Sequence, residues 1–271
     1  MIECLVNGEI LKFVPASDRG LNYGDGVFET IAVIQGRPRL WQEHMDRLAI
    51  GCERLGMEAP PQAVLLRELQ TVCAGLQRCI VKIVLSRAYS GRGYSPLIGA
   101  APERVVSSYL WQADSSNHTV TGVDAHICEI KLAIQPALGG MKHLNRLEQV
   151  LASRELDSVT EHEGILFDAE DHLISTISAN IFMVYRGQVL TPRLDRSGVR
   201  GVLRSQILKV FKARCELRRI SREMLDEASE VFLCSAVRGI IPIKRIDEIE
   251  YPIGPATREF QAWLAESVSV Q

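Results

Sequence analysis

The stretch that decides the interpretation of this chain reads Gly139-Gly140-Met141-Lys142-His143-Leu144-Asn145-Arg146-Leu147-Glu148-Gln149-Val150. Two glycines free the backbone just before a lysine and leave room beside it for a bulky group. Downstream of the lysine, four apolar residues recur at helical spacing: Leu144, Leu147, Val150 and Leu151. We therefore expect Lys142 at a loop-to-helix junction, followed by a helix that continues to about Leu156.

A lysine at a helix start faces the positive end of the helix dipole. Lys142 is therefore a candidate for a depressed pKa and for covalent chemistry through its amine. On local features alone, a solvated helix lysine is the competing interpretation. Lys82 is the main rival for such chemistry, but it lies inside an apolar strand, Cys79 to Ser86, with no glycine and no helix start beside it.

The run Gly-x-Lys-His-Leu-Asn-Arg-Leu-Glu-Gln-Val, residues 140–150, resembles the Schiff-base lysine segment of aminodeoxychorismate lyases. These lyases are pyridoxal-phosphate enzymes of fold type IV, the family that also contains branched-chain and D-amino-acid aminotransferases. Further segments resemble the same family in the same order, from about residue 5 to about residue 245. The eleven-residue run is more specific than an isolated Gly-x-Lys, and it favours the lyase over the aminotransferases.

The composition agrees with a soluble globular protein. The chain has 271 residues, of which 46% are hydrophobic and 24% charged, enough for one large domain or two of moderate size. A net charge of −2 gives no indication of a nucleic-acid or membrane partner. We find no apolar run of about 18 residues and no basic start, so we expect no transmembrane helix and no signal peptide. Seven scattered cysteines without zinc spacing indicate buried thiols in a reducing cytoplasm.

The first part of the chain carries a glycine-rich motif that begins with Tyr23. Tyr-Gly-Asp-Gly-x-Phe-Glu-Thr, residues 23–30, leads into the β-rich run Val27 to Ile34 and overlaps its first half. It resembles the family's early motif, whose side chains face the substrate side of the cofactor, so the resemblance makes Tyr23 a candidate substrate residue. A bulged strand is the alternative from local features.

An amphipathic helix is predicted from Leu40 to Leu55. Its apolar stripe consists of Trp41, Met45, Leu48, Cys52 and Leu55. Arg47, in His-Met-Asp-Arg-Leu, matches the family arginine that contacts the cofactor phosphate, and a fork-shaped guanidinium suits a phosphate dianion. Without the family, an exposed helix arginine is the simpler interpretation. We interpret His44 as structural rather than catalytic.

The loop Gly91-Arg92-Gly93-Tyr94 also resembles the lyases. By that resemblance, Arg92 and Tyr94 would face an anionic, ring-shaped substrate, one by its charge and the other by its flat face and hydroxyl. A flexible surface loop is the competing interpretation.

One position departs from the family. The string Ser178-Ala179-Asn180-Ile181-Phe182 matches it, but most members carry a Thr-Glu pair where this chain has Ile174-Ser175. The family's glutamate keeps the pyridine nitrogen protonated, whereas Ser175 can share only a neutral hydrogen bond. Several unrelated pyridoxal-phosphate lyases place a serine there, and a weaker electron sink disfavours transamination more than elimination. Ser175 thus favours a lyase, and it agrees equally with a weakened or idle enzyme.

A glycine-punctuated loop, Leu194 to Arg204, opens a helix that is predicted to continue to about Arg214. Backbone amides at such a terminus form an anion cradle. We predict three free amides there, those of Gly201, Val202 and Leu203. The family uses this loop for the cofactor phosphate. A second phosphate or carboxylate contact of the family falls on the Ser235-Ala236 turn.

The polar run Gln112 to His118 places a domain boundary. The resemblance implies a two-domain, mixed α/β or α+β fold of type IV. We predict a small α/β domain at residues 1–111, a linker at 112–117, and a larger mixed-sheet α/β domain at 118–271 that carries Lys142. The cofactor, pyridoxal 5'-phosphate, is expected at the domain interface.

The implied function is 4-amino-4-deoxychorismate lyase, which gives 4-aminobenzoate and pyruvate for folate synthesis. Lys142 would first hold the cofactor as an aldimine, and the freed amine would then move the ring proton to the departing enolpyruvate. The resemblance also implies a cytoplasmic homodimer without nucleic-acid or membrane partners. Two alternatives stay open: a D-amino-acid or branched-chain aminotransferase of the same fold, and a cofactor-binding homologue without turnover.

Overall fold

The computed structural model describes residues 1–10, 13–87, 93–96, 101–111, 117–158 and 161–269. Backbone contacts divide the chain into two compact units. Unit 1 comprises Met1–Ala113 and the segment Met141–Asn145, and unit 2 comprises Asp114–Gly140 and Arg146–Gln271. We predicted Lys142 within the larger domain, but its segment groups with unit 1.

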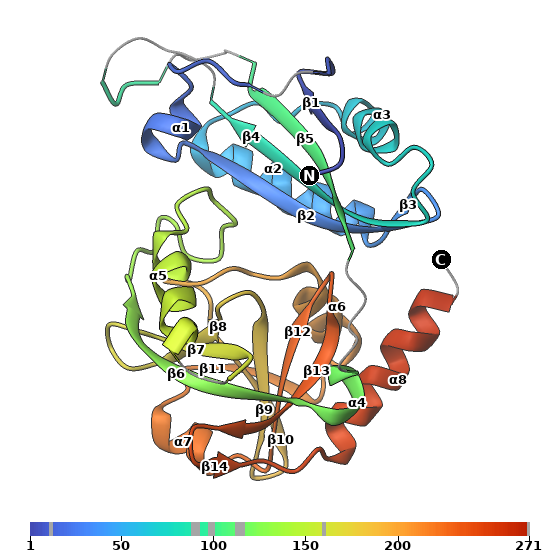
Figure 1. Cartoon of the computed structure of the whole chain (residues 1–271). Coiled ribbons are helices and arrows are strands. Elements are labelled where there is room, and N and C mark those ends of the chain that lie inside the picture. The colour runs from blue at the N-terminus through green and yellow to red at the C-terminus, as the bar shows by residue number, and fades with distance from the viewer. Residues whose placement is uncertain (11–12, 88–92, 97–100, 112–116, 159–160, 270–271) are drawn as a thin grey trace. The chain divides into compact units, whose positions relative to one another are not determined.

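Unit 1 is built on a five-stranded antiparallel sheet in the order β1-β5-β4-β2-β3 (Figure 1). Its strands are β1 (Cys4–Val6), β2 (Gly26–Ile34), β3 (Arg37–Pro38), β4 (Arg78–Ser86) and β5 (Glu103–Leu110), and its helices are α1 (Arg19–Tyr23), α2 (Trp41–Leu55) and α3 (Gln62–Val72). We expected a hairpin of Cys4–Val6 with Glu9–Val14. Among the described residues a single Val6–Glu9 bridge joins these segments, and β1 pairs with β5.

Helix α2 confirms the predicted amphipathic helix. Met45, Leu48 and Cys52 from its apolar stripe are buried in the core of unit 1. Gly51 lies on the same side, where an added Cβ would come within 2.9 Å of Val27 Cγ1 on β2. The helix and the sheet can therefore pack closely only because this position has no side chain. Gly56, in the left-handed conformation, ends the helix.

Unit 2 contains a nine-stranded mixed sheet in the order β11-β10-β9-β12-β13-β6-β7-β8, with β14 beside β13. Its strands are β6 (Val123–Leu132), β7 (Glu163–Asp168), β8 (Leu173–Thr176), β9 (Asn180–Tyr185), β10 (Gln188–Pro192), β11 (Cys215–Arg218), β12 (Glu230–Ser235), β13 (Gly239–Ile246) and β14 (Ile249–Glu250). Its helices are α4 (His118–Thr121), α5 (Leu147–Glu155), α6 (Val202–Val210), α7 (Arg222–Asp226) and α8 (Pro255–Ser269), with a short 3-10 turn at Leu156–Ser158.

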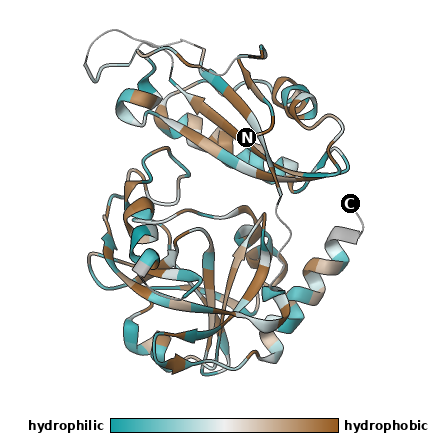
Figure 2. Cartoon of the chain, in the orientation of Figure 1, coloured by the Kyte–Doolittle hydropathy of each residue, from teal (hydrophilic) through white to brown (hydrophobic). Residues whose placement is uncertain are grey.

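The core of unit 2 lies on this sheet, where hydrophobic residues concentrate along the strands (Figure 2). Phe182 on β9 and Phe232 on β12 stack with their ring centroids 5.2 Å apart, and Phe260 of α8 packs at 5.4 Å from Phe232. All three rings are fully buried. Burial of such rings contributes strongly to folding, so α8 is fixed to the sheet by its apolar side.

Candidate active site

Lys142 lies in an extended segment, and the prediction that it sits at a helix start is wrong. The carbonyl of Lys142 accepts from the Phe28 N–H at 3.1 Å, and the Leu144 N–H donates to Gly26 O at 3.0 Å. Helix α5 begins only at Leu147. Because the edge of β2 satisfies these backbone groups, residues 142–144 run alongside the strand and do not form a helix. The helix-dipole argument for this lysine therefore does not apply.

The amine of Lys142 faces an aromatic ring of β2. Its Nζ lies 4.2 Å from the centroid of Phe28. Lys82, the rival from the sequence, pairs with Thr30 across the sheet and places its Nζ 5.2 Å from the same ring. The two lysines that the sequence proposed as alternatives are thus neighbours on one face of unit 1. A ring face stabilises a nearby cation without supplying a competing hydrogen bond.

Arg47 is held by a buried carboxylate, which the sequence analysis did not identify. The Glu29 side chain is fully buried on β2, and it accepts from Arg47 Nε at 2.7 Å. His44 Nδ1 lies 2.6 Å from Glu29 Oε2. Burial raises the pKa of the Glu29 carboxyl, but the charge of Arg47 and the hydrogen bonds of both partners outweigh it and lower that pKa to about 2.

This cluster fixes the guanidinium of Arg47 in place. The Arg47 side chain is 15% exposed, so it is not the solvated helix arginine of the alternative interpretation. His44 is structural, as predicted, in the sense that it braces Glu29 from within the core. The position of Glu29 in the motif at residues 23–30 was the available signal for its role.

Two of the predicted substrate residues meet in unit 1. The rings of Tyr23 and Tyr94 have centroids 5.5 Å apart with an interplanar angle of 58°. Tyr23 is 40% exposed and Tyr94 85% exposed, so the pair presents aromatic surface to solvent. The third candidate, Arg92, lies outside the described residues.

In unit 2, the double glycine packs against the loop that was predicted to bind phosphate. The Gly140 N–H donates to Gly198 O, and the Arg200 N–H donates to Gly140 O, both at 3.0 Å. An added Cβ at Gly139 would lie 2.6 Å from Asp195 O, and Gly140 has a φ of +79°. The room that the glycines provide is therefore filled by backbone of the loop at residues 194–200.

Asn180 organises the end of this loop, a role that the sequence analysis missed. Its Oδ1 accepts from the Gly201 N–H at 3.0 Å, and its Nδ2 donates to Val199 O at 2.8 Å. The prediction that the Gly201 amide is free is therefore wrong. Val202 and Leu203 form the first turn of α6, where N–H groups have no partner within the helix. Their amides and the helix dipole remain suited to an anion.

The other predicted residues of unit 2 lie on the same sheet. Ser175 is buried on β8, opposite Leu166 of β7. Ser235 ends β12, and its hydroxyl accepts from the Arg238 N–H at 3.1 Å. Ala236 follows in the turn between β12 and β13, as the sequence predicted.

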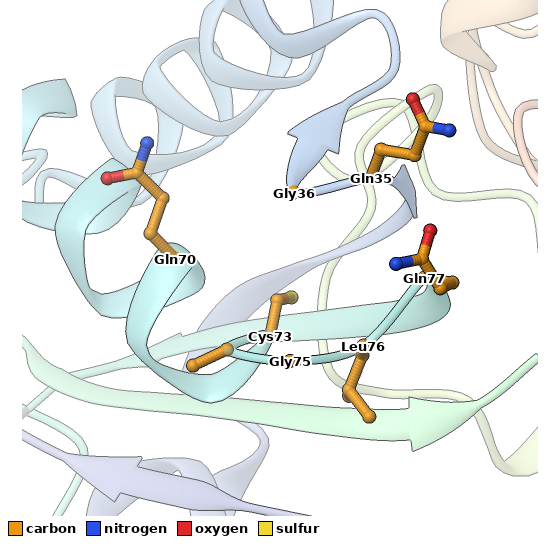
Figure 3. Close-up of a pocket in the computed structure, with 8 residues that line it drawn as sticks. Gln35, Gly36, Gln70, Cys73, Gly75, Leu76 and Gln77 are labelled. Atoms are coloured by element: carbon orange, nitrogen blue, oxygen red, sulfur yellow. The ribbon is translucent and has the colours of Figure 1, made fainter.

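A cavity of about 480 Å³ lies elsewhere on unit 1, where the β2–β3 turn meets the loop between α3 and β4 (Figure 3). Gln35, Gln70, Cys73 and Gln77 contribute to its lining, and none of the predicted site residues does.

Within the described ranges, we find no cluster of side chains suited to a metal ion and no helix long and apolar enough to cross a membrane. All seven cysteines are described and are free thiols, six of them buried.

Residues 26–246 match the model of the class IV amino-transferase family, and the chain belongs to this family. Aminodeoxychorismate lyase of Vibrio harveyi is 34% identical over 263 residues, covering 94% of this chain and 97% of that protein. The structure of 4-amino-4-deoxychorismate lyase from Pseudomonas aeruginosa superposes with a TM-score of 0.92 and 38% identity, covering 97% of this chain and 98% of that one.

Branched-chain aminotransferases are similar at lower identity. The Escherichia coli enzyme is 27% identical over 285 residues, covering 94% of this chain and 89% of that protein. These matches confirm the predicted fold class, fold type IV, and the predicted family.

Proposed function

We propose that this chain is a pyridoxal-phosphate-dependent lyase that converts 4-amino-4-deoxychorismate into 4-aminobenzoate and pyruvate. The observation that carries the proposal is the lysine segment. Its eleven residues resemble the lysine segment of the lyases, and β2 fixes its backbone while the Lys142 amine faces the Phe28 ring. The similarity to two lyases over nearly the whole chain supports the same activity.

The residues present fit the cofactor. Its phosphate dianion requires hydrogen-bond donors, and the first-turn amides of Val202 and Leu203 supply them together with the helix dipole. An added Cβ at Gly201 would lie 2.0 Å from Asn180 Oδ1, so the cradle demands glycine. Within unit 2, the Ser235-Ala236 turn would add a hydroxyl and backbone donors. The family resemblance assigns Arg47 of unit 1 to the same phosphate, and Glu29 already orients its guanidinium.

The bound cofactor would supply an electron sink for the substrate. Ser175 is the residue that we assign to the pyridine nitrogen, where its neutral hydroxyl shares a hydrogen bond without fixing a charge. Lys142 would hold the cofactor covalently and, once released, act as the base that removes the ring proton and as the acid that protonates the departing enolpyruvate. Since aromatisation of the product ring drives the elimination, a modest electron sink suffices.

We also propose a cytoplasmic homodimer. Three apolar side chains of α5 face solvent: Leu147 (75% exposed), Val150 (53%) and Leu151 (43%). Three such residues at helical spacing form an apolar stripe that a second copy of the chain would cover. A membrane or nucleic-acid partner has no support in the net charge of −2.

The test is release of pyruvate from 4-amino-4-deoxychorismate by the purified chain, with and without added pyridoxal phosphate. We expect cofactor-dependent release. Faster amino-group transfer to 2-oxoglutarate would support a branched-chain or D-amino-acid aminotransferase instead, the activity class of the 27% identical relative. Bound cofactor without either product would support a homologue that does not turn over. Of the two alternatives to the lyase, the neutral Ser175 agrees better with this one than with an aminotransferase.

A further inference from the structure

Arg19 is a buried cation that holds an exposed loop. It is the first residue of α1 and is 4% exposed. Its Nη1 donates to Gly93 O and its Nη2 to Tyr94 O, each at 2.9 Å. Both arms of one guanidinium are therefore committed to two successive carbonyls of the loop that carries Tyr94.

The same guanidinium also supports the second tyrosine. Its carbon lies 4.8 Å from the ring centroid of Tyr23. Tyr23 and Tyr94 belong to different elements, and Arg19 is in contact with both. Burying a cation costs free energy unless its partners satisfy it. The Asp25 carboxylate is its counter-ion, through Nε, while both terminal nitrogens and the guanidinium face are used on a solvent-facing loop and ring. The counter-ion accounts for the buried charge, but it does not account for what the two terminal nitrogens hold.

The position of Arg19 is itself fixed. Its Nε donates to Asp25 Oδ2 at 2.9 Å. The Arg19 N–H donates to Arg87 O, and its carbonyl accepts from the Asp25 N–H, both at 3.3 Å. Side chain and backbone are thus tied to neighbouring elements of unit 1, and the guanidinium cannot follow the loop if the loop moves.

We propose that Arg19 is a positioning residue for substrate recognition. It locks the Gly93–Tyr94 backbone and the Tyr23 ring into one aromatic corner, which receives the ring of a cyclic carboxylate substrate. The inference rests on the proposed function, which gives Tyr23 and Tyr94 their contact with substrate. Arg19 touches neither the substrate nor the cofactor; its effect is on the geometry of the two tyrosines.

Arg87 provides a matched control. It is 6% exposed, and its Nε donates to the same Asp25 Oδ2 at 2.9 Å. Its remaining nitrogens donate to Gly56 O and Leu55 O, at the end of α2. The two arginines are therefore both buried and share one counter-ion. They differ in the carbonyls that their terminal nitrogens bind, in the Tyr94 loop for Arg19 and at the end of α2 for Arg87. Lysine keeps the charge in either place but cannot span two carbonyls.

The experiment compares Arg19→Lys with Arg87→Lys in the full chain with pyridoxal phosphate. Loss of a two-pronged hydrogen bond should raise KM for pyruvate release about tenfold in Arg19→Lys, with kcat within about twofold of wild type. The two variants should lower Tm by similar amounts, but Arg87→Lys should leave KM unchanged. Hydrogen exchange at residues 93–95 should accelerate only in Arg19→Lys, a readout that does not depend on turnover.

Equal changes in KM for the two variants, or unchanged exchange at residues 93–95, would overturn the proposal, while pyruvate release by wild type would leave the proposed function intact. Absence of pyruvate release by wild type would defeat the proposed function, and the exchange comparison would then decide the positioning role alone. Tyr94→Ala is a second test of the proposal that should not disturb folding, because this side chain is 85% exposed. It should raise KM as Arg19→Lys does, and an unchanged KM would count against the aromatic corner.

Discussion

At the scale of single residues, the site in unit 1 depends on side chains that the sequence did not single out. Arg47 is predictable from its motif, but its orientation comes from Glu29, which lies eighteen positions earlier in the chain. A carboxylate that is fully buried between a guanidinium and an imidazole is stabilised in its charged form. Removal of that charge leaves a buried cation without its counter-ion, which is the costly case for a buried ion pair.

Glu29→Gln should therefore lower the free energy of unfolding at pH 7 by about 3 kcal/mol. The pKa of Glu29 lies below its ordinary value of 4.5, at about 2. Its contribution is complete above about pH 4.5 and is lost as the pH falls toward 2. In urea titrations, the difference between wild type and variant should shrink over that window. Glu53→Gln, an exposed position on α2, is the control. A stability difference between wild type and Glu29→Gln that does not depend on pH would contradict the assigned ionisation.

At the scale of elements, local patterns predicted α2 well because its apolar stripe lies on one helix and packs on its neighbour in the chain. The segment after Lys142 has a similar stripe, yet it begins extended and leaves Leu147 exposed. Pairing of residues 142–144 with β2, more than a hundred positions away, decides this, and no local period contains that information. The same holds for Asn180, whose two bonds close the loop before α6.

Gly201→Ala tests the loop before α6. Its Cβ would displace the Asn180 side chain and break the hydrogen bonds to Gly201 and Val199. We expect the affinity for pyridoxal phosphate to fall about tenfold, since the amides that follow would lose their fixed direction. Equilibrium binding followed by cofactor absorbance measures this. Val210→Ala, at an exposed position at the other end of α6, should bind as wild type, and equal binding by Gly201→Ala would remove the loop from the phosphate site.

The exposed stripe of α5 makes a prediction about assembly. In the double variant Leu147→Asp, Val150→Asp, two apolar side chains that a second copy would bury become charged. Each such burial contributes about 2 kcal/mol, so the dimer should weaken at least about a hundredfold. Analytical ultracentrifugation should show monomer where wild type is a dimer. Ser153→Asp, also exposed on α5, is the control. A double variant that sediments as wild type would exclude this face from the interface.

At the scale of the whole molecule, the family agrees with the proposed chemistry, in which Lys142 would hold the cofactor and the first turn of α6 would bind its phosphate. The sequence predicted the fold class because the family resemblance extends over most of the chain. It did not predict that two lysines share the ring of Phe28, because that proximity arises only from strand pairing. Lys82 is consequently the natural control for Lys142.

The most direct measurement is pyruvate release from 4-amino-4-deoxychorismate, recorded with the visible absorbance of the bound cofactor, for wild type, Lys142→Ala and Lys82→Ala. Wild type should release pyruvate and show the band. Lys142→Ala should lose the band and at least about a thousandfold in rate, whereas Lys82→Ala should keep the band because its amine does not hold the cofactor. A Lys142→Ala protein with the wild-type band and rate, or a wild type that releases no pyruvate, would contradict the account.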